Sequence, residues 1–337
     1  MTVESSPVQE QRGARIRAVL LRQDVLLLVV FIAMIAFFSI LNPRFFSAAA
    51  AANILQDFSP VMLMAIGQAF VILSGGIDLS VGAVLGLSGV TTAMIIRDQS
   101  ANGSDPGVAI ALGLIAGVVV GALVGLVNGL LITYGRLAPF IATLATMGAA
   151  AGITLVVTGG VQIAGAPREL ILLGNTTYLG LFTIPVMVVI VIAALAWLYV
   201  SRSKFGRWTY AIGSNSFAAR GAGINVRRHL LKIYVISGVL AALAGAFVYF
   251  RLGSGSPLSG RGGELNAIAA VVVGGIALTG GIGRLSGVIL GSLIITAVLS
   301  GLIIIGVEPN WQQVVIGALI AVAVGIQGIG SFKGRTL

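Results

Sequence analysis

The sequence has no cysteine, a single histidine (His229) and only three lysines. Without cysteine the chain has no disulfide, thiolate metal site or cysteine nucleophile, and one imidazole cannot build a histidine metal centre. None of the lysines follows a glycine, whereas a nucleotide-binding P-loop needs a Gly-Lys pair so that backbone amides and the ammonium reach the phosphates together. We therefore expect no metal, no cofactor and no ATP binding through a P-loop.

Charge is also scarce. Only 9% of the residues are charged and 58% are hydrophobic, whereas about 25% are charged in a soluble domain. The hydrophobic residues suffice for roughly ten membrane spans of about 20 residues each, which leaves no polar sequence for a separate catalytic domain. The chain also has 47 glycines, about twice the usual share, and small residues let membrane helices pack closely. The composition predicts an all-α polytopic membrane protein.

Polar and turn-forming residues divide the apolar sequence into ten segments, which predict about ten transmembrane or partly membrane-embedded helices. Several breaks carry turn signals, such as Asn42-Pro43 and Glu308-Pro309-Asn310. We expect residues 25–330 to form a single transmembrane domain, with a basic segment 1–24 before it and a tail 331–337 after it. The expected segments are 25–41, 53–74, 79–96, 108–134, 139–158, 181–200, 233–252, 263–282, 287–306 and 311–330.

The basic residues indicate how the chain is oriented. If the N-terminus is cytoplasmic, fifteen of the twenty lysines and arginines fall on the cytoplasmic side, which is the bias that sets membrane orientation. Both termini are then cytoplasmic, and the net charge of +10 is a topology signal, with lipid and not nucleic acid as the partner. The arginines before Val25 and the apolar run after it also fit a signal peptide, but multispan proteins commonly keep their first apolar segment as an anchor.

A glycine-rich turn occurs twice. The thirteen residues 74–86, which begin Ser-Gly-Gly-Ile-Asp-Leu-Ser, are identical at six positions to residues 279–291, which begin Thr-Gly-Gly-Ile. This indicates an internal repeat. Gly-interrupted segments at matching places in two halves point to a transport pathway, although each could equally be a tight reversal between two spans.

Two further features lie within the apolar sequence. Asp78 is an acid in an apolar stretch, which favours a functional role because a membrane charge is costly; the alternative is that Asp78 or Ser80 caps the next helix. Five glycines recur every four residues and form one smooth helix face, which favours close helix packing. These are Gly113, Gly117, Gly121, Gly125 and Gly129.

The longest polar connection, residues 201–232, has seven basic residues and no acid. Within it we expect a short helix that begins at Ser214 or Asn215 as its cap and ends in a left-handed turn at Gly223. Because a short helix exposed to water is marginal alone, a docking partner is a reasonable inference. The alternative is an ordinary cytoplasmic loop that lies against anionic lipid headgroups.

Three stretches, 70–82, 210–224 and 264–275, carry a family resemblance. The first reads Phe-Val-Ile-Leu-Ser-Gly-Gly-Ile-Asp-Leu-Ser-Val-Gly, the second opens with Tyr-Ala-Ile-Gly, and the third reads Glu-Leu-Asn-Ala-Ile-Ala-Ala-Val-Val-Val-Gly-Gly. With them the chain resembles the permease subunits of bacterial ABC importers for monosaccharides, of the ribose, xylose and galactoside type. The resemblance extends over most of the chain, from Asn42 to Gln327.

This resemblance implies a multi-pass protein of the bacterial inner membrane. Its expected partners are a cytoplasmic ABC ATPase, a second permease copy or paralogue, and a periplasmic sugar-binding protein. The second stretch resembles the coupling loop that docks on the ATPase and implies a coupling helix formed by Gly213, Asn215, Ala218, Ala219, Gly223 and Ile224. Candidates for the translocation pathway are Asn53, Gln68, Ser74, Gly75, Gly76, Asp78, Asn128 and Asn266. For each polar candidate, a hydrogen bond between helices is the alternative.

Other functions remain open at this stage. A branched-chain amino-acid ABC permease would use the same machinery for a different cargo. An ion-coupled secondary transporter would need embedded acids, for which Asp57 and Asp78 are available. A membrane enzyme is disfavoured because the sequence suggests no cluster of acid, histidine and nucleophile.

Overall fold

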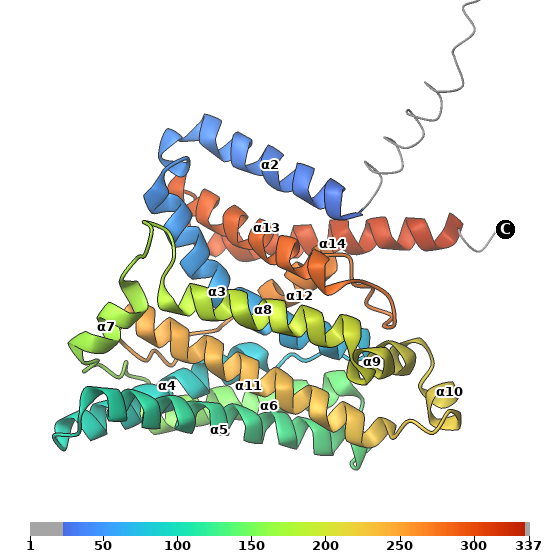
Figure 1. Cartoon of the computed structure of the whole chain (residues 1–337), viewed down its shortest axis with the longest axis horizontal. Coiled ribbons are helices and arrows are strands. Elements are labelled where there is room, and N and C mark those ends of the chain that lie inside the picture. Colours follow the sequence, from blue (N-terminus) through green and yellow to red (C-terminus); the bar gives the residue numbers. More distant parts are fainter. Residues whose placement is uncertain (1–22, 334–337) are drawn as a thin grey trace, which may run out of the picture.

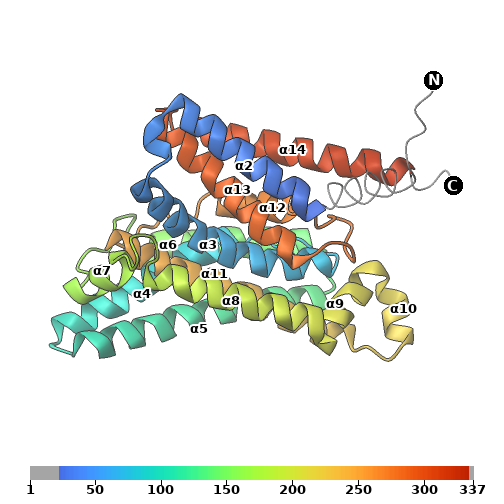
Figure 2. The same cartoon turned by 45° about the horizontal axis from the view of Figure 1, so that its top comes forward.

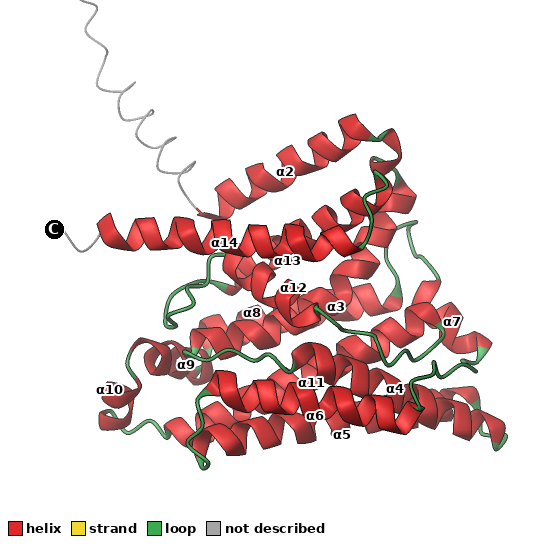
Figure 3. Ribbon diagram, turned by 180° about the vertical axis from the view of Figure 1, so that it is seen from behind, coloured by secondary structure: helices red, strands yellow, loops and turns green. Residues whose placement is uncertain are grey.

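The computed structural model describes residues 23–333, and within this range the chain consists of helices joined by loops (Figure 3). In chain order the elements are α2 (Gln23–Leu41), η1 (Pro43–Phe45), α3 (Ala48–Leu73), α4 (Val81–Ala101), α5 (Pro106–Thr133), α6 (Pro139–Thr158), α7 (Arg168–Asn175), α8 (Ile184–Arg202), α9 (Lys204–Ser214), α10 (Ser216–Gly221), α11 (Val226–Leu252), α12 (Gly263–Val273), α13 (Leu285–Ile304) and α14 (Asn310–Lys333).

The predicted all-helical membrane fold is confirmed. Eight of the described helices are long and apolar enough to cross a membrane, namely α2, α3, α4, α5, α6, α8, α11 and α13. Two shorter apolar helices, α12 and the 310–325 part of α14, complete the set. These ten correspond in order to the ten segments expected from the sequence.

Helix boundaries follow local chemistry. Asp105 precedes Pro106, the first residue of α5, and its Oδ1 accepts hydrogen bonds from the amides of Gly107 (2.8 Å) and Val108 (3.3 Å). These bonds satisfy amides that have no partner inside the helix, and proline is tolerated at the first helical position. Gly159 ends α6 with φ +62°, a left-handed conformation that glycine adopts without strain.

The glycine stripe on α5 packs as predicted. All five glycines are buried, and α5 lies against α4 and α11. A Cβ at Gly121 would overlap the backbone carbonyl of Gly238 on α11, and one at Gly117 would overlap the Thr92 hydroxyl on α4. Helix backbones therefore approach each other at these positions in a way that only glycine permits.

The helices run between two ends of the molecule (Figure 1). The start of α2, the end of α14, and both α9 and α10 lie at one end, whereas α7 and the C-terminal end of α11 lie at the other (Figures 1 and 2). Helices α3 and α11 form the centre, since most of each is buried. The start of α2 and the end of α14 thus lie at the same end. The termini themselves, 1–22 and 334–337, are outside the described residues, and their cytoplasmic location stays a prediction.

The repeated glycine turn differs from its sequence alignment in one respect. The turns precede α4 and α13, as the alignment implies, but α12 ends at Val273, well before the glycine pair 280–281. The glycine that ends α12 is Gly275, whose φ of +86° equals that of Gly75 after α3. Helices α3 and α12 end with the same hydrogen bond: the Gly76 amide donates to the Val71 carbonyl, and the Ile276 amide donates to the Val271 carbonyl. The loop after α12 is therefore longer, and the sequence alignment matched the wrong glycines.

Candidate functional site

Asp78 lies in the loop between α3 and α4 and is fully buried. Its Oδ1 accepts hydrogen bonds from the backbone amide (2.9 Å) and the hydroxyl (2.6 Å) of Ser80, and its Oδ2 accepts from the Ser237 hydroxyl on α11 (2.9 Å). Ser80 occupies the N-cap position of α4, one of the two expected, but the expected side-chain bond to a free amide of the helix is absent there. The carboxylate instead joins its loop to α11.

The hydrogen bonds continue through three more helices. The Ser80 hydroxyl accepts from Asn128 Nδ2 on α5 (2.8 Å), and Asn128 Oδ1 accepts from the Thr146 hydroxyl on α6 (2.6 Å). On α3, the Gln68 side-chain amide lies 3.0 Å from the carbonyl oxygen and 3.2 Å from the amide nitrogen of Asp78, and the amide orientation that donates to the first and accepts from the second satisfies both groups. Three of the pathway candidates, Gln68, Asp78 and Asn128, are thus joined in one buried network, which is how interhelical hydrogen bonds satisfy polar groups in membranes.

The remaining pathway candidates are separated from this network. Ser74 and Gly76 are buried near it, whereas Asn53 and Gly75 are exposed. Asn266 lies on α12 and borders a polar cavity together with Asp57. Whether any of the eight residues contacts cargo stays a prediction.

The cavity beside Asn266 has a volume of about 270 Å³ and is formed by α3, α12, α13, α14 and the 253–262 loop, with Leu85 of α4 and Val248 of α11. An adjoining cavity of about 240 Å³ shares Gly260 and Arg261 with it and is bordered by Glu264. Polar groups in membrane proteins commonly face such cavities. The polar side chains that line the larger cavity are Asp57, Arg261, Asn266, Thr296, Ser300 and Gln312.

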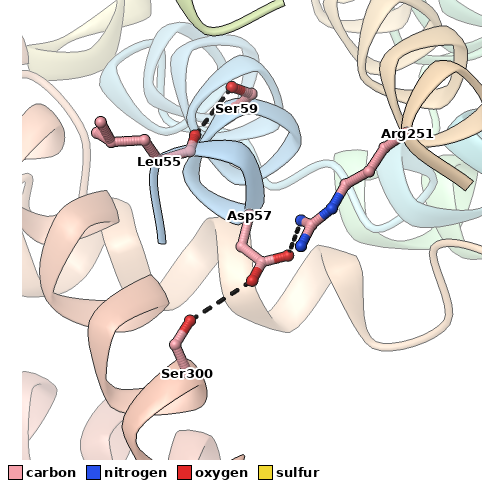
Figure 4. Close-up of polar contacts among 5 residues, drawn as sticks. All are labelled: Leu55, Asp57, Ser59, Arg251 and Ser300. Atoms are coloured by element: carbon pink, nitrogen blue, oxygen red, sulfur yellow. Dashed lines mark hydrogen bonds and ion pairs between the residues drawn. The ribbon is translucent and has the colours of Figure 1, made fainter. Parts of the chain in front are cut away.

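An ion pair marks the rim of this cavity. Asp57 on α3 pairs with Arg251 at the end of α11, and the Ser300 hydroxyl on α13 donates to the second carboxylate oxygen (3.5 Å; Figure 4). Arg251 also complements the partial negative charge at the C-terminus of its helix. Carboxylate, guanidinium, amide and hydroxyl groups together can both donate to and accept from the hydroxyls of a bound molecule.

Most of this cavity was missed from the sequence. Asp57 was considered only as an acid for ion coupling, and Thr296, Ser300 and Gln312 were not considered. These residues lie far apart in the chain and have no shared spacing, so no local pattern could join them.

At the other end, the expected short helix is present as α10. Asn215 Oδ1 accepts from the amides of Phe217 and Ala218 (both 3.0 Å), which caps the helix start. Gly223 has φ +82° and ends the helix in a left-handed turn. Both predicted caps are therefore confirmed.

The orientation of α10 corrects one expectation. Ala219, which we expected on the docking surface, is only 4% exposed and packs against Ile212 of α9 and Val226 of α11. The outward residue is Phe217, which is 81% exposed. Sequence reasoning passed over Phe217, although an aromatic side chain in a short helix of a basic loop was the available signal.

Taken together, the membrane helices, the polar cavity at one end and the capped, outward-facing α10 at the other define the class of a multi-pass membrane transport subunit. The profile of a family described as "Branched-chain amino acid transport system / permease component" matches residues 50–324.

Known relatives agree with this match. The ribose import permease protein RbsC of Bacillus subtilis (strain 168) is 46% identical over 85% of this chain and 87% of its own length. The D-allose transport system permease protein AlsC of Escherichia coli (strain K12) is 38% identical over 87% of each chain. The fructose import permease protein FrcC of Rhizobium meliloti is 37% identical over 89% of this chain and 83% of its own. No solved structure shows a significant match.

The chain belongs to this family of permease components. It is a permease subunit of a bacterial ABC importer, a multi-pass membrane protein that transports and does not catalyse a reaction of its own. The resemblance identified from residues 70–82, 210–224 and 264–275 is confirmed, and the alternative of an ion-coupled secondary transporter is wrong.

Proposed function

We propose that this permease carries a monosaccharide, a ribose-like pentose or a hexose, into the cell. The observation that carries the proposal is the 46% identity to a ribose import permease over most of both chains, with allose and fructose permeases at 38% and 37%. These cargoes are small monosaccharides that carry several hydroxyls. The proposed complex contains this permease, a second copy or paralogue, a cytoplasmic ABC ATPase and a periplasmic sugar-binding protein.

The polar cavity suits a sugar. Its lining offers amide, hydroxyl and guanidinium groups that suit several hydroxyls at once. We place the substrate's entry into the membrane at this cavity.

We assign the ATPase contact to α10. The exposed ring of Phe217 lies on a rigid, capped helix in a basic loop, and an apolar side chain on a short helix suits insertion into a hydrophobic groove. Movement of the ATPase on ATP binding would reach the membrane helices through this contact. The ATPase is required because this chain carries no P-loop of its own.

The direct test is uptake by the reconstituted complex. The permease is assembled with its cognate ATPase and binding protein in liposomes, and accumulation of labelled ribose, allose, fructose, xylose and leucine is measured with and without ATP. We expect ATP-dependent accumulation of at least one monosaccharide and none of leucine. Accumulation of leucine without any sugar would replace the proposal by the branched-chain amino-acid alternative.

A further inference from the structure

Three segments from distant parts of the chain meet at the end of the molecule that carries α10. A Cβ at Gly213, near the end of α9, would overlap the carbonyl oxygen of Leu73 at the end of α3 and would lie 2.6 Å from the amide nitrogen of Gly281. A Cβ at Gly280 would lie 2.9 Å from the Cα of Gly75. The three backbones therefore touch without intervening side chains. We call residues 73–76, 213–214 and 280–283 the glycine joint.

Hydrogen bonds hold the glycine joint together. The Gly281 amide donates to the Leu73 carbonyl (3.0 Å), one of the helix-end carbonyls that have no partner within their own helix. From α9, the Tyr210 hydroxyl donates to the Gly283 carbonyl (2.9 Å). Burial raises the pKa of Tyr210, although the charge of Arg284 opposes this, so the phenol keeps its proton and remains a donor at neutral pH. Helix α9 is thus bonded to the loop before α13 and packed on the end of α3.

The same helix is firmly attached to α10. Ile212 of α9 packs against Ala219 of α10, and both contact Val226 at the start of α11. Near the other end of α9, the Phe205 ring packs edge-on against Phe70 of α3 at 5.9 Å between centroids. A displacement of α10 is therefore passed to α9 and on to the glycine joint without a loose linker.

The helices that leave the glycine joint reach the polar cavity. Helix α3 ends at the joint and carries Asp57, about 24 Å away at 1.5 Å per residue. Helix α13 begins beside it and carries Thr296 and Ser300, and α12, which leads into the joint, carries Asn266. The glycines of the joint include several with positive φ, among them Gly75, Gly280 and Gly281. Glycine moves between such conformations more readily than any other residue.

We propose that the glycine joint transmits the movement of α9 and α10 to α3, α12 and α13, and so opens or closes the polar cavity. Tyr210, Gly213 and Gly281 are then positioning residues for transport, although none of them contacts cargo. This inference rests on the proposed function, because it takes α10 as the place where the ATPase acts.

The test compares Gly213→Ala and Tyr210→Phe with the control Gly148→Ala on α6, whose added methyl meets nothing within 4 Å. Each variant is reconstituted with the ATPase and binding protein, and sugar transported per ATP hydrolysed is measured. We expect Gly213→Ala to bind the ATPase and hydrolyse ATP, with the transport ratio about tenfold lower because the backbones are forced apart. Tyr210→Phe lowers the ratio less, and Gly148→Ala leaves it unchanged. A wild-type ratio in a folded Gly213→Ala complex overturns the proposal; if that variant does not fold, a wild-type ratio in Tyr210→Phe overturns it.

A distance measurement separates failure of the joint from failure of the proposed cargo. Because the chain has no cysteine, a spin-label pair at Ala222→Cys, directly after α10, and Leu258→Cys in the exposed loop beside the cavity has no background from this chain. In the complex with the ATPase, a non-hydrolysable ATP analogue should change the distance in the otherwise native chain but not with Gly213→Ala. An equal change in both overturns the joint, whatever sugar is carried. Failure of the native chain to bind the ATPase overturns the proposed function instead.

Discussion

Phe217 is the residue whose environment argues most directly for a partner. Its ring is 81% exposed on a helix that is otherwise fixed by Asn215, Gly223 and the contacts of Ala219. A fully exposed aromatic ring at the tip of a basic loop gains nothing for the isolated chain, whereas buried aromatic anchors dominate many protein interfaces.

Phe217→Ser should weaken ATPase binding by about 2 kcal/mol, about thirtyfold, because it removes such an anchor. The unfolding temperature should not change, since the side chain contacts little within the chain. Affinity for the purified ATPase checks this. The matched control is Phe46→Ser, which alters a ring that is 80% exposed in the turn between η1 and α3, far along the chain from α10. Equal binding by Phe217→Ser and the native chain would show that α10 docks differently.

The structure gives Asp78 a different role from the two expected from the sequence: its carboxylate joins the loop before α4 to α11. Asp78 is neither a helix cap nor bordered by the polar cavity, and its oxygens bind hydroxyls of Ser80 and Ser237. We expect Asp78→Asn to keep ATP-driven transport and to lose about 1 kcal/mol of stability, because hydroxyls can rotate to accept from the new amide.

Asp78→Leu should destabilise the chain by about 3 kcal/mol or more, because it leaves buried polar groups without partners. Thermal unfolding in detergent measures both variants. If Asp78→Asn folds like the native chain but abolishes transport, the carboxylate charge itself is required and the structural role is insufficient.

Among the elements, α12 carries Asn266, a pathway candidate that borders the polar cavity. Asn266→Ala should lower uptake at limiting sugar concentration about tenfold, since one hydrogen bond to a hydroxyl is lost. Asn53→Ala is the matched control, because Asn53 is an exposed asparagine on α3 outside that cavity. Initial uptake rates measure the difference. The opposite ranking of the two variants would move the pathway away from this cavity.

The packing of α5 against α11 gives a stability prediction. Gly121→Ala should destabilise the chain by about 1–3 kcal/mol, because the new methyl overlaps the Gly238 carbonyl. Gly148→Ala on α6 has open space around its Cβ and should be neutral or slightly stabilising, since alanine favours helices. The unfolding temperatures of the two variants measure this difference in stability. A Gly121→Ala chain as stable as Gly148→Ala would mean that α5 and α11 are not so close.

The sequence predicted the individual helices better than the tertiary contacts between them. The ten apolar segments and the caps of α10 follow from local chemistry, and the structure contains them. The end of α12 at Val273 did not follow from the sequence. The glycine pairs 274–275 and 280–281 are equal stop signals for a helix, and only the tertiary hydrogen bond from Gly281 to Leu73 distinguishes the second pair. The polar cavity could not be predicted from the sequence either. Asp57 and Ser300 are brought together by the packing of α3 against α13, and the spacing of residues along the chain does not indicate this contact.

At the scale of the whole molecule, the permease has two proposed functional regions at opposite ends: one for the substrate and one for the ATPase. Asp57 borders the polar cavity and pairs with Arg251 in the last turn of α11, and this end of α11 lies opposite α10 (Figure 1). The glycine joint connects them through α3, α12 and α13. Nothing in this arrangement supplies energy, because a chain without a P-loop has no such route to ATP.

The central claim is that energy comes only from partner subunits. The most direct measurement places the purified permease alone in liposomes under an imposed proton or sodium gradient, and compares it with the full complex supplied with ATP. The account predicts that sugar accumulates against its gradient only in the complex with ATP. Accumulation by the permease alone under an ion gradient would contradict it.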